Sequence, residues 1–107
     1  MIKAIVLIPL RLNDGTLVPV GTVIEFYARV FALSPSGHTR RPGASGSWRD
    51  DDGSVFTDDL TEFIFALPSW RDVSAFLSLV DWARVEMQQE AMYIEVMGVP
   101  EVLGPNV

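Results

Sequence analysis

The chain contains no cysteine. Disulfide bonds, thiolate nucleophiles and cysteine-ligated metal sites are therefore excluded. His38 is the only histidine, so a transition-metal site would need carboxylates for all of its remaining ligands. The sequence also lacks a phosphate-binding glycine loop, a Gly-x-Ser-x-Gly elbow and a paired His-Glu motif, which removes support for the established hydrolase and nucleotide-binding classes. We expect no metal and no cofactor.

Basic residues are scarce as well. Fourteen acidic residues stand against eight basic ones, and the net charge is -6. Such a chain repels a phosphate backbone, because nucleic-acid binding needs a clustered basic face that releases counterions. We expect no nucleic-acid partner. Arg40, Arg41 and Arg49 nevertheless lie close together in the sequence, and this local group of cations could bind a single anionic group.

The apolar run from Ile2 to Leu10 is too short to cross a membrane. No small-residue cleavage motif follows it, so it is not typical of a secretory signal. We expect no membrane contact and a cytoplasmic location. A chain of 107 residues with 49% hydrophobic residues is long enough to bury one core, and residues 1–107 are expected to form a single domain.

Several segments have the apolar patterns of β-strands. Residues 2–10 are apolar at nearly every position, as is the second half of 60–67, which is typical of central strands covered on both faces. Residues 47–49 and 54–56 flank an Asp-Gly turn and predict a hairpin. Residues 91–99 alternate between the apolar set Met92, Ile94 and Val96 and the set Tyr93, Glu95 and Met97, which predicts an edge strand with one buried face.

Two helices are predicted between these strands. Thr22 and Glu25 have the spacing of a capping box, in which each side chain binds the backbone N–H of the other, so the first helix should begin there. It should end before Pro35, because the residue preceding a proline is pushed out of the helical region. Ser69 and Asp72 predict the start of the second helix, with Ser69 as its N-cap.

The predicted element order is therefore β-α-β-β-α-β. Two right-handed crossovers of this kind build a four-stranded antiparallel sheet, with the strands at 2–10 and 60–67 inside it. We therefore predict an α+β fold, a ferredoxin-like split sandwich with both helices on one face of the sheet.

Nothing in such a monomer covers the second face of the sheet, although its central strands are apolar on both sides. The face would carry one of two residue sets, either Ile5, Leu7, Phe63 and Phe65 or Ala4, Val6, Ile64 and Ala66. We predict a homodimer through this open sheet face, because pairing two copies covers the patch economically. The alternative is that the C-terminal tail or the loop at 34–46 covers it.

Parts of the chain resemble known proteins. The segments concerned are Gly37-His38-Thr39, Gly46-Ser47-Trp48, Asp52-Gly53, Leu67-Pro68-Ser69-Trp70 and Gln89-Glu90-Ala91-Met92-Tyr93-Ile94-Glu95-Val96. In this order they resemble small uncharacterised bacterial proteins carried on mobile elements, namely phages and integron gene cassettes. The architecture looks like the dimeric α+β barrel superfamily, which includes monooxygenases and isomerase-like enzymes. That resemblance concerns the fold and does not fix a function.

Four residues are candidates for binding a ligand. His38 lies in the glycine- and proline-rich loop at 34–46, beside Arg40, where it could act as an acid or base or could simply fix the loop. Trp48 suits the wall of a pocket or the edge of a core. Tyr93 lies on a strand that should be buried on at least one face, or it points to solvent.

Aspartates gather at 50–52 and 58–59. Hard cations bind several carboxylate oxygens, so the cluster invites comparison with a calcium loop. An EF-hand needs a glycine at its sixth position and a glutamate at its twelfth, and no loop that starts at Asp50, Asp51 or Asp52 meets both requirements. We interpret the cluster as a solvated hairpin turn.

Two functional hypotheses remain. The main one is a small homodimeric, non-enzymatic protein-interaction or regulatory module, since no catalytic constellation is visible and a partner protein could dock on the sheet face. The alternative is a small-molecule-binding protein or an enzyme of the dimeric α+β barrel type. Its apolar or anionic ligand would lie between sheet and helices, near His38, Arg40, Trp48 and Tyr93. Whether the protein is an enzyme is left open.

Overall fold

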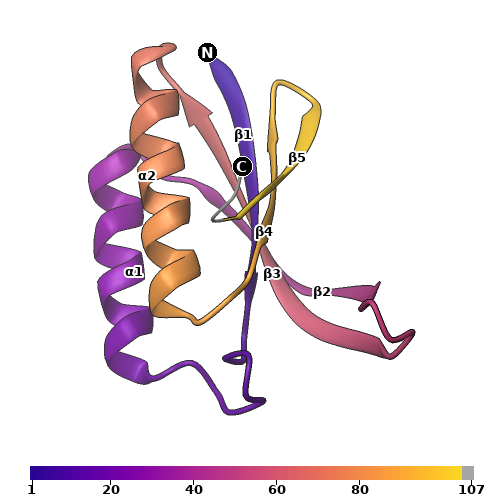
Figure 1. Ribbon diagram of the computed structural model, residues 1–107. Helices are drawn as coiled ribbons and strands as arrows, with labels where there is room; N and C mark the ends of the chain where they lie inside the picture. The colour runs from indigo at the N-terminus through magenta and orange to yellow at the C-terminus, as the bar shows by residue number, and fades with distance from the viewer. Residues whose placement is uncertain (105–107) are drawn as a thin grey trace.

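The computed structural model describes residues 1–104. Its elements, in chain order, are β1 (Ile2–Pro9), α1 (Val20–Leu33), β2 (Thr39–Arg49), β3 (Val55–Leu67), α2 (Arg71–Glu86), β4 (Met92–Val96) and β5 (Val99–Leu103). The strands form one antiparallel sheet in the order β2-β3-β1-β4-β5. Both helices cover one face of the sheet, and the other face is open (Figure 1). The predicted α+β class is confirmed, with β1 and β3 inside the sheet.

The fifth strand is a departure from the prediction. Residues 99–103 form β5, which pairs with β4 and takes the edge position that we assigned to β4. Met97 and Gly98 make the turn between them, with φ values of 54° and 79°, the left-handed geometry of a tight hairpin. Pro100 lies in β5, and proline is tolerated there because an edge strand leaves one side of its backbone unpaired.

The core lies between the sheet and the helices. Val6 pairs with Phe63, and Ala4 pairs with Phe65. All four side chains are buried, and the Phe65 ring meets Phe76 of α2 edge-on, with ring centres 5.8 Å apart. Packing against the helices therefore explains why the residues on this face of β1 and β3 are apolar.

The residues on the open face of the sheet match neither of the two sets predicted from the sequence. The β1–β3 register places Ile5 opposite Ile64 and Leu7 opposite Glu62, so Ile5 and Leu7 share a face with Ile64 and not with the phenylalanines. Ile5 is only 8% exposed although no helix covers it. It lies between Ile64 on one neighbouring strand and Glu95 on the other. The bare patch is therefore smaller than the sequence pattern suggests.

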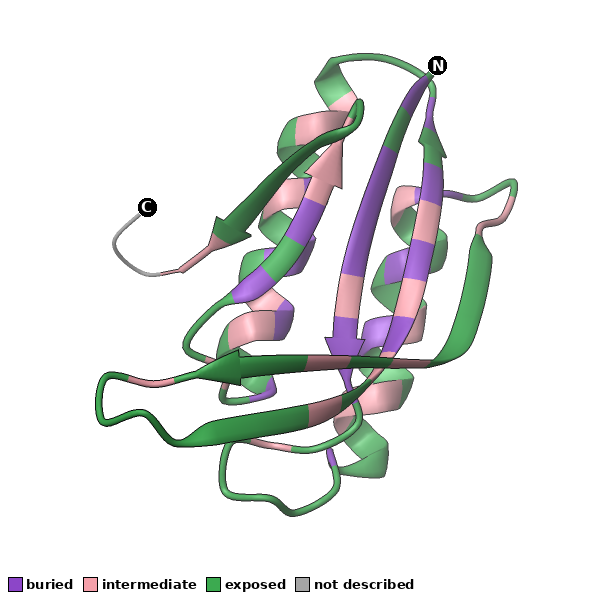
Figure 2. Cartoon of the chain, turned by 90° about the vertical axis from the view of Figure 1, so that its right-hand side faces the viewer, coloured by how far each residue is buried: buried purple, intermediate pink, exposed green. Residues whose placement is uncertain are grey.

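The β2–β3 hairpin bends sharply. β2 begins at Thr39, so the loop predicted at 34–46 is reduced to 34–38. The register shifts between Arg41 and Ala44, where a β-bulge bends and twists the strand. Beyond the bulge, the hairpin turns across the open side of the molecule, past the ends of β1 and β4 (Figure 2). We call residues 44–60 the hairpin arm.

The helix starts follow the prediction only in part. α1 begins at Val20 after Pro19, and no side chain caps it, so the predicted capping box at Thr22 and Glu25 is wrong. At α2 the N-cap is Trp70, one residue after the predicted Ser69. The predicted pair still interacts, since the Asp72 carboxylate accepts hydrogen bonds from the N–H and the hydroxyl of Ser69. Within residues 1–104, no helix is long and apolar enough to cross a lipid bilayer.

Candidate functional site

A cavity of about 520 Å³ lies on the open side of the sheet, between the hairpin arm and the adjoining ends of β1 and β4. Its size is within the range of small-molecule sites. It is lined by Leu7, Pro9, Asn13, Gly46, Ser47, Trp48, Asp58, Leu60, Gln89, Glu90, Ala91, Met92, Tyr93 and Val102. The bend of the arm creates this space, because a straight hairpin would only extend the flat sheet.

The arm holds Trp48 in a fixed position. Trp48 lies opposite Phe56 in the hairpin, and their rings stack with centres 4.6 Å apart and planes 20° from parallel. The indole Nε1–H donates a hydrogen bond of 3.2 Å to Oδ2 of Asp58. Side chains at alternate positions of a strand share a face, so Trp48, Phe56 and Asp58 lie together. The indole is 44% exposed and is free to stack against a ligand.

Gly46 keeps the floor of the cavity open. It lies opposite Asp58 in the hairpin and on the same face as Trp48. A Cβ atom at this position would lie 3.1 Å from Cδ1 of Leu60, closer than an ordinary van der Waals contact. Any larger side chain would extend into the space between the indole and the sheet.

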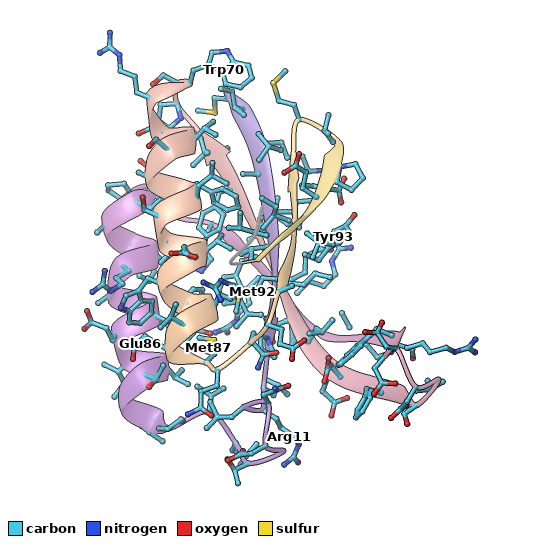
Figure 3. All side chains as sticks on the ribbon, in the orientation of Figure 1. Arg11, Trp70, Glu86, Met87, Met92 and Tyr93 are labelled. Atoms are coloured by element: carbon cyan, nitrogen blue, oxygen red, sulfur yellow. The ribbon has the colours of Figure 1, made fainter. Side chains whose placement is uncertain are left out.

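Tyr93 forms the opposite wall. It points away from the helices, whereas its neighbour Met92 points toward them (Figure 3). The Tyr93 hydroxyl donates a hydrogen bond of 3.3 Å to Oε2 of Glu95. Desolvation raises the pKa of Tyr93, and the charge and hydrogen bond of Glu95 raise it further. The phenol therefore stays protonated at neutral pH and acts as a donor.

Gln89 fixes the third side of the cavity. Its side-chain amide donates to the carbonyl of Arg11 at 3.1 Å and to the carbonyl of Met87 at 2.9 Å. The first bond ties the turn after α2 to the loop after β1, and the second closes the turn itself. The preceding residue, Gln88, has a φ of 53°, which redirects the chain from α2 toward β4.

The charged side chains that line the cavity are negative. Asp58 and Glu90 contribute carboxylates, and the lining contains no lysine, arginine or histidine. Aromatic faces at Trp48 and Tyr93 attract cations through their negative π-surfaces. Within the described chain, the cavity therefore favours a neutral or positively charged ligand with a flat aromatic part.

The structure separates the predicted site residues into two places. Trp48 and Tyr93 face each other across the cavity, whereas His38 and Arg40 line a groove beside α1. The space between sheet and helices, where we expected the pocket, is filled by core side chains. Asp58 was assigned only to the acidic cluster, although its alternation with Phe56 and Leu60 places all three on one strand face. Nothing local marks Gln89, whose contact with Arg11 joins residues 78 positions apart.

The carboxylates of the acidic turn at 50–52 accept hydrogen bonds from the turn itself. Asp50 Oδ1 accepts hydrogen bonds from the backbone N–H groups of Asp52 and Ser54. Hydrogen bonds from Ser54, and then the interaction with Asp50, lower the pKa of Asp52 to about 2. Among residues 1–104, no group of three or more His, Cys, Asp or Glu side chains is placed to bind a metal ion. This geometry is that of a hydrogen-bonded hairpin turn.

No protein-family model matches the chain, and no curated protein matches its sequence. Among solved structures, a phage SAM lyase in complex with S-methyl-5'-thioadenosine matches with a TM-score of 0.71 and 15% identity, over 98% of this chain and 90% of that one. A phage SAM lyase in the apo state matches with a TM-score of 0.65 and 13% identity, over 99% of this chain and 90% of that one. These TM-scores show a shared fold.

The comparisons correct two of our predictions. They support the phage part of the resemblance seen in the sequence, and they give no support to the integron-cassette part. Our main functional hypothesis, a non-enzymatic interaction or regulatory module, is also corrected. The matched structures are those of an enzyme, and one of them contains a small ligand, which favours the alternative of a small-molecule-binding protein or enzyme. The chain has the fold of a phage SAM lyase over nearly its full length.

Proposed function

We propose that this protein binds S-adenosylmethionine in the cavity on the open side of the sheet and cleaves it to S-methyl-5'-thioadenosine. The observation that carries the proposal is the combination of aromatic walls and carboxylates, without any cationic side chain, in a cavity of about 520 Å³. The ligand of the matched lyase supports the same class of molecule.

Each part of S-adenosylmethionine suits a group in the cavity. The adenine ring is flat and can stack on the exposed face of Trp48. Ribose hydroxyls donate hydrogen bonds, and Asp58 offers carboxylate oxygens beside that ring. The sulfonium is a cation, which the carboxylates of Asp58 and Glu90 and the aromatic rings attract. Trp48 and Asp58 would determine affinity for the adenosine part, and the acidic rim would favour the sulfonium over a neutral thioether.

The proposed reaction breaks the bond between sulfur and the γ carbon of the methionyl chain. The bonding electrons stay on sulfur, which loses its positive charge and leaves as the neutral thioether. The methionyl carboxylate can supply the electron pair for the γ carbon, closing a lactone ring without loss of a proton. In this route the protein supplies no base, and its part is to hold the chain in a folded conformation and to exclude water.

The first experiment measures binding and turnover in the same preparation. Isothermal titration calorimetry with S-methyl-5'-thioadenosine is expected to give saturable binding. Chromatography after incubation with S-adenosylmethionine is expected to show the thioether together with homoserine lactone. An unsaturated amino acid in place of the lactone would exclude the lactone route. Absence of both binding and turnover would contradict the proposal.

Matched variants locate the site. Trp48→Ala and Asp58→Asn should each weaken binding of the thioether by roughly tenfold or more, because they remove a stacking surface and a charged acceptor. Trp70→Ala is the control for the first, since Trp70 lies at the start of α2, away from the arm (Figure 3). Asp59→Asn is the control for the second, since its side chain lies on the other face of the same strand. Equal losses in variants and controls would exclude the cavity.

A third variant tests the cavity by filling it. Gly46→Leu adds a side chain beside Trp48, where the nearest atom is the flexible end of Leu60. We expect loss of thioether binding with little change in the thermal midpoint. Ser45→Leu places the same side chain on the opposite face of β2 and should bind normally.

The homodimer through the open sheet face stays a prediction, as does the cytoplasmic location. A second copy on this face would cover the mouth of the cavity and exclude water from it. Light scattering with and without S-methyl-5'-thioadenosine measures the solution mass. A monomer under both conditions would contradict the dimer and leave the cavity proposal standing.

A further inference from the structure

A shallow, open groove lies on the side of the molecule that carries the helices. It has a volume of about 540 Å³ and is lined by Tyr27 and Phe31 of α1 and by His38 and Arg40 at the start of β2. It shares no lining residue with the cavity on the open face. The groove and the cavity are therefore separate sites, and the proposed lyase chemistry does not use the groove.

Arg40 supplies a cation without an anionic partner. Its Nη1 donates a hydrogen bond of 2.5 Å to the Tyr27 hydroxyl oxygen, and its guanidinium carbon lies 5.6 Å from the centre of that ring. Within residues 1–104 Arg40 forms no salt bridge, whereas its neighbour Arg41 lies 4.0 Å from a carboxylate oxygen of Glu62. Because the Tyr27 oxygen accepts from Arg40, its own proton is free to be donated elsewhere. Two hydrogen-bond donors, the guanidinium of Arg40 and the hydroxyl of Tyr27, thus lie at the groove with room for an acceptor.

The rest of the groove is aromatic. The His38 ring meets Phe31 edge-on at 5.2 Å between ring centres and stacks on Phe63 at 5.6 Å. Its Nδ1 is buried and has no hydrogen-bond partner among residues 1–104. Burial lowers the pKa of His38, and the positive charge of Arg40 lowers it further. His38 is therefore neutral at physiological pH and contributes a flat, mainly apolar surface.

We propose that this groove binds a small aromatic carboxylate. The carboxylate would accept from the remaining guanidinium N–H groups of Arg40, whose planar fork matches two carboxylate oxygens, and from the Tyr27 hydroxyl. The aromatic body would pack against Phe31 and the exposed part of His38. This arrangement selects a ligand of opposite charge to the one that the cavity favours.

The single histidine makes the test direct. A single imidazole Hε1 signal is expected in the proton NMR spectrum, and benzoate is the probe. Saturable binding should move that signal, because the ring of benzoate would pack against the imidazole of His38 while its carboxylate binds Arg40. Acetate has the same charge without the ring and should bind at least roughly tenfold more weakly. Equal affinity for acetate and benzoate would overturn the aromatic class, and no movement with benzoate would overturn the site.

Variants separate binding from a general salt effect. Arg40→Gln should abolish the benzoate response, and Tyr27→Phe should weaken it. Arg41→Gln is the matched control, since Arg41 is adjacent in sequence and its side chain points to the opposite face of β2. Tyr27→Phe removes the hydroxyl and keeps the ring that packs on the core. It therefore tests the site even where Arg40→Gln lowers the fraction of folded protein. An Arg40→Gln protein that responds like the wild type would overturn the proposal.

Discussion

At the scale of single residues, the side chains that matter are those whose partners come from distant parts of the chain. Trp48 and Tyr93 were selected from the sequence as aromatic residues on strands. They were expected to line a pocket between sheet and helices, whereas the structure places both in the cavity on the open side. Asp58 and Gln89 gain their roles from a hairpin partner and from a loop contact. No local pattern marks such contacts, because they depend on the bulge in β2 and on the turn after α2.

His38 shows how one residue links packing to pH. Its ring lies among Phe31, Phe63 and Phe65, and its pKa is lowered from the ordinary value of 6.5. The unfolded chain therefore takes up a proton at a higher pH than the folded protein. The free energy of unfolding should fall as the pH drops below 6.5, and it should level off below the folded-state pKa.

His38→Phe should remove this dependence, because phenylalanine keeps the aromatic packing and does not titrate. Urea denaturation at several pH values between neutrality and the carboxylate range measures the effect. The lowered pKa values of Asp14 and Asp52 act below 3.8, so they do not overlap with this window. If the wild type and His38→Phe have parallel profiles, the histidine is not the cause.

At the scale of elements, apolar runs are what made the central strands predictable. β1 is apolar at every position except Lys3, the second half of β3 is also apolar, and both strands were placed correctly inside the sheet. The first half of β2 reads as a loop because Thr39–Arg41 is polar and Pro42-Gly43 follows. Backbone pairing with the inner strand β3 nevertheless makes it a strand. β5 was missed for a similar reason, since its residues are mostly exposed and include Pro100.

The start of α1 provides a test at the same scale. Gly21 lies in the first turn of the helix, its φ is not positive, and a Cβ atom there would meet nothing within 4 Å. Gly21→Ala should therefore raise the free energy of unfolding by about 0.4–1 kcal/mol, because alanine has fewer unfolded conformations to lose. Chemical denaturation measures this change.

Gly15 is the matched control. Its Cβ position is equally open, but its φ is 90°, a conformation that costs an ordinary residue roughly 1–2 kcal/mol. Gly15→Ala should therefore destabilise the protein. If both substitutions stabilise, backbone conformation is not the deciding factor, and the argument about Gly21 is wrong.

At the scale of the whole molecule, charge is distributed so that the two proposed sites differ. The chain has a net charge of -6, and the open-face cavity carries carboxylates only, whereas the groove beside α1 carries Arg40. The sheet and its packed core separate them, with the cavity on the open side and the groove on the helix side. The fold thus presents a site suited to a cation on one side and a site suited to an anion on the other.

This separation predicts that the two proposed ligands stabilise the protein independently. A ligand that binds only the folded state at 100 times its dissociation constant raises the free energy of unfolding by about 2.7 kcal/mol. S-methyl-5'-thioadenosine and benzoate at such concentrations should each produce this increase. Together they should produce the sum to within about 0.5 kcal/mol, as is usual for distant sites that share no partner. Chemical denaturation with each ligand alone and with both measures the three values.

Variants of each site show which ligand causes any deviation from additivity. Gly46→Leu should lose the contribution of the thioether and keep that of benzoate, and Arg40→Gln should do the reverse. Failure of one ligand alone would count against its own site and leave the other intact. A combined effect well below the sum, with both single effects present, would mean that the ligands compete or that the sheet transmits a conformational change between its two sides, and the independence of the sites would then be wrong.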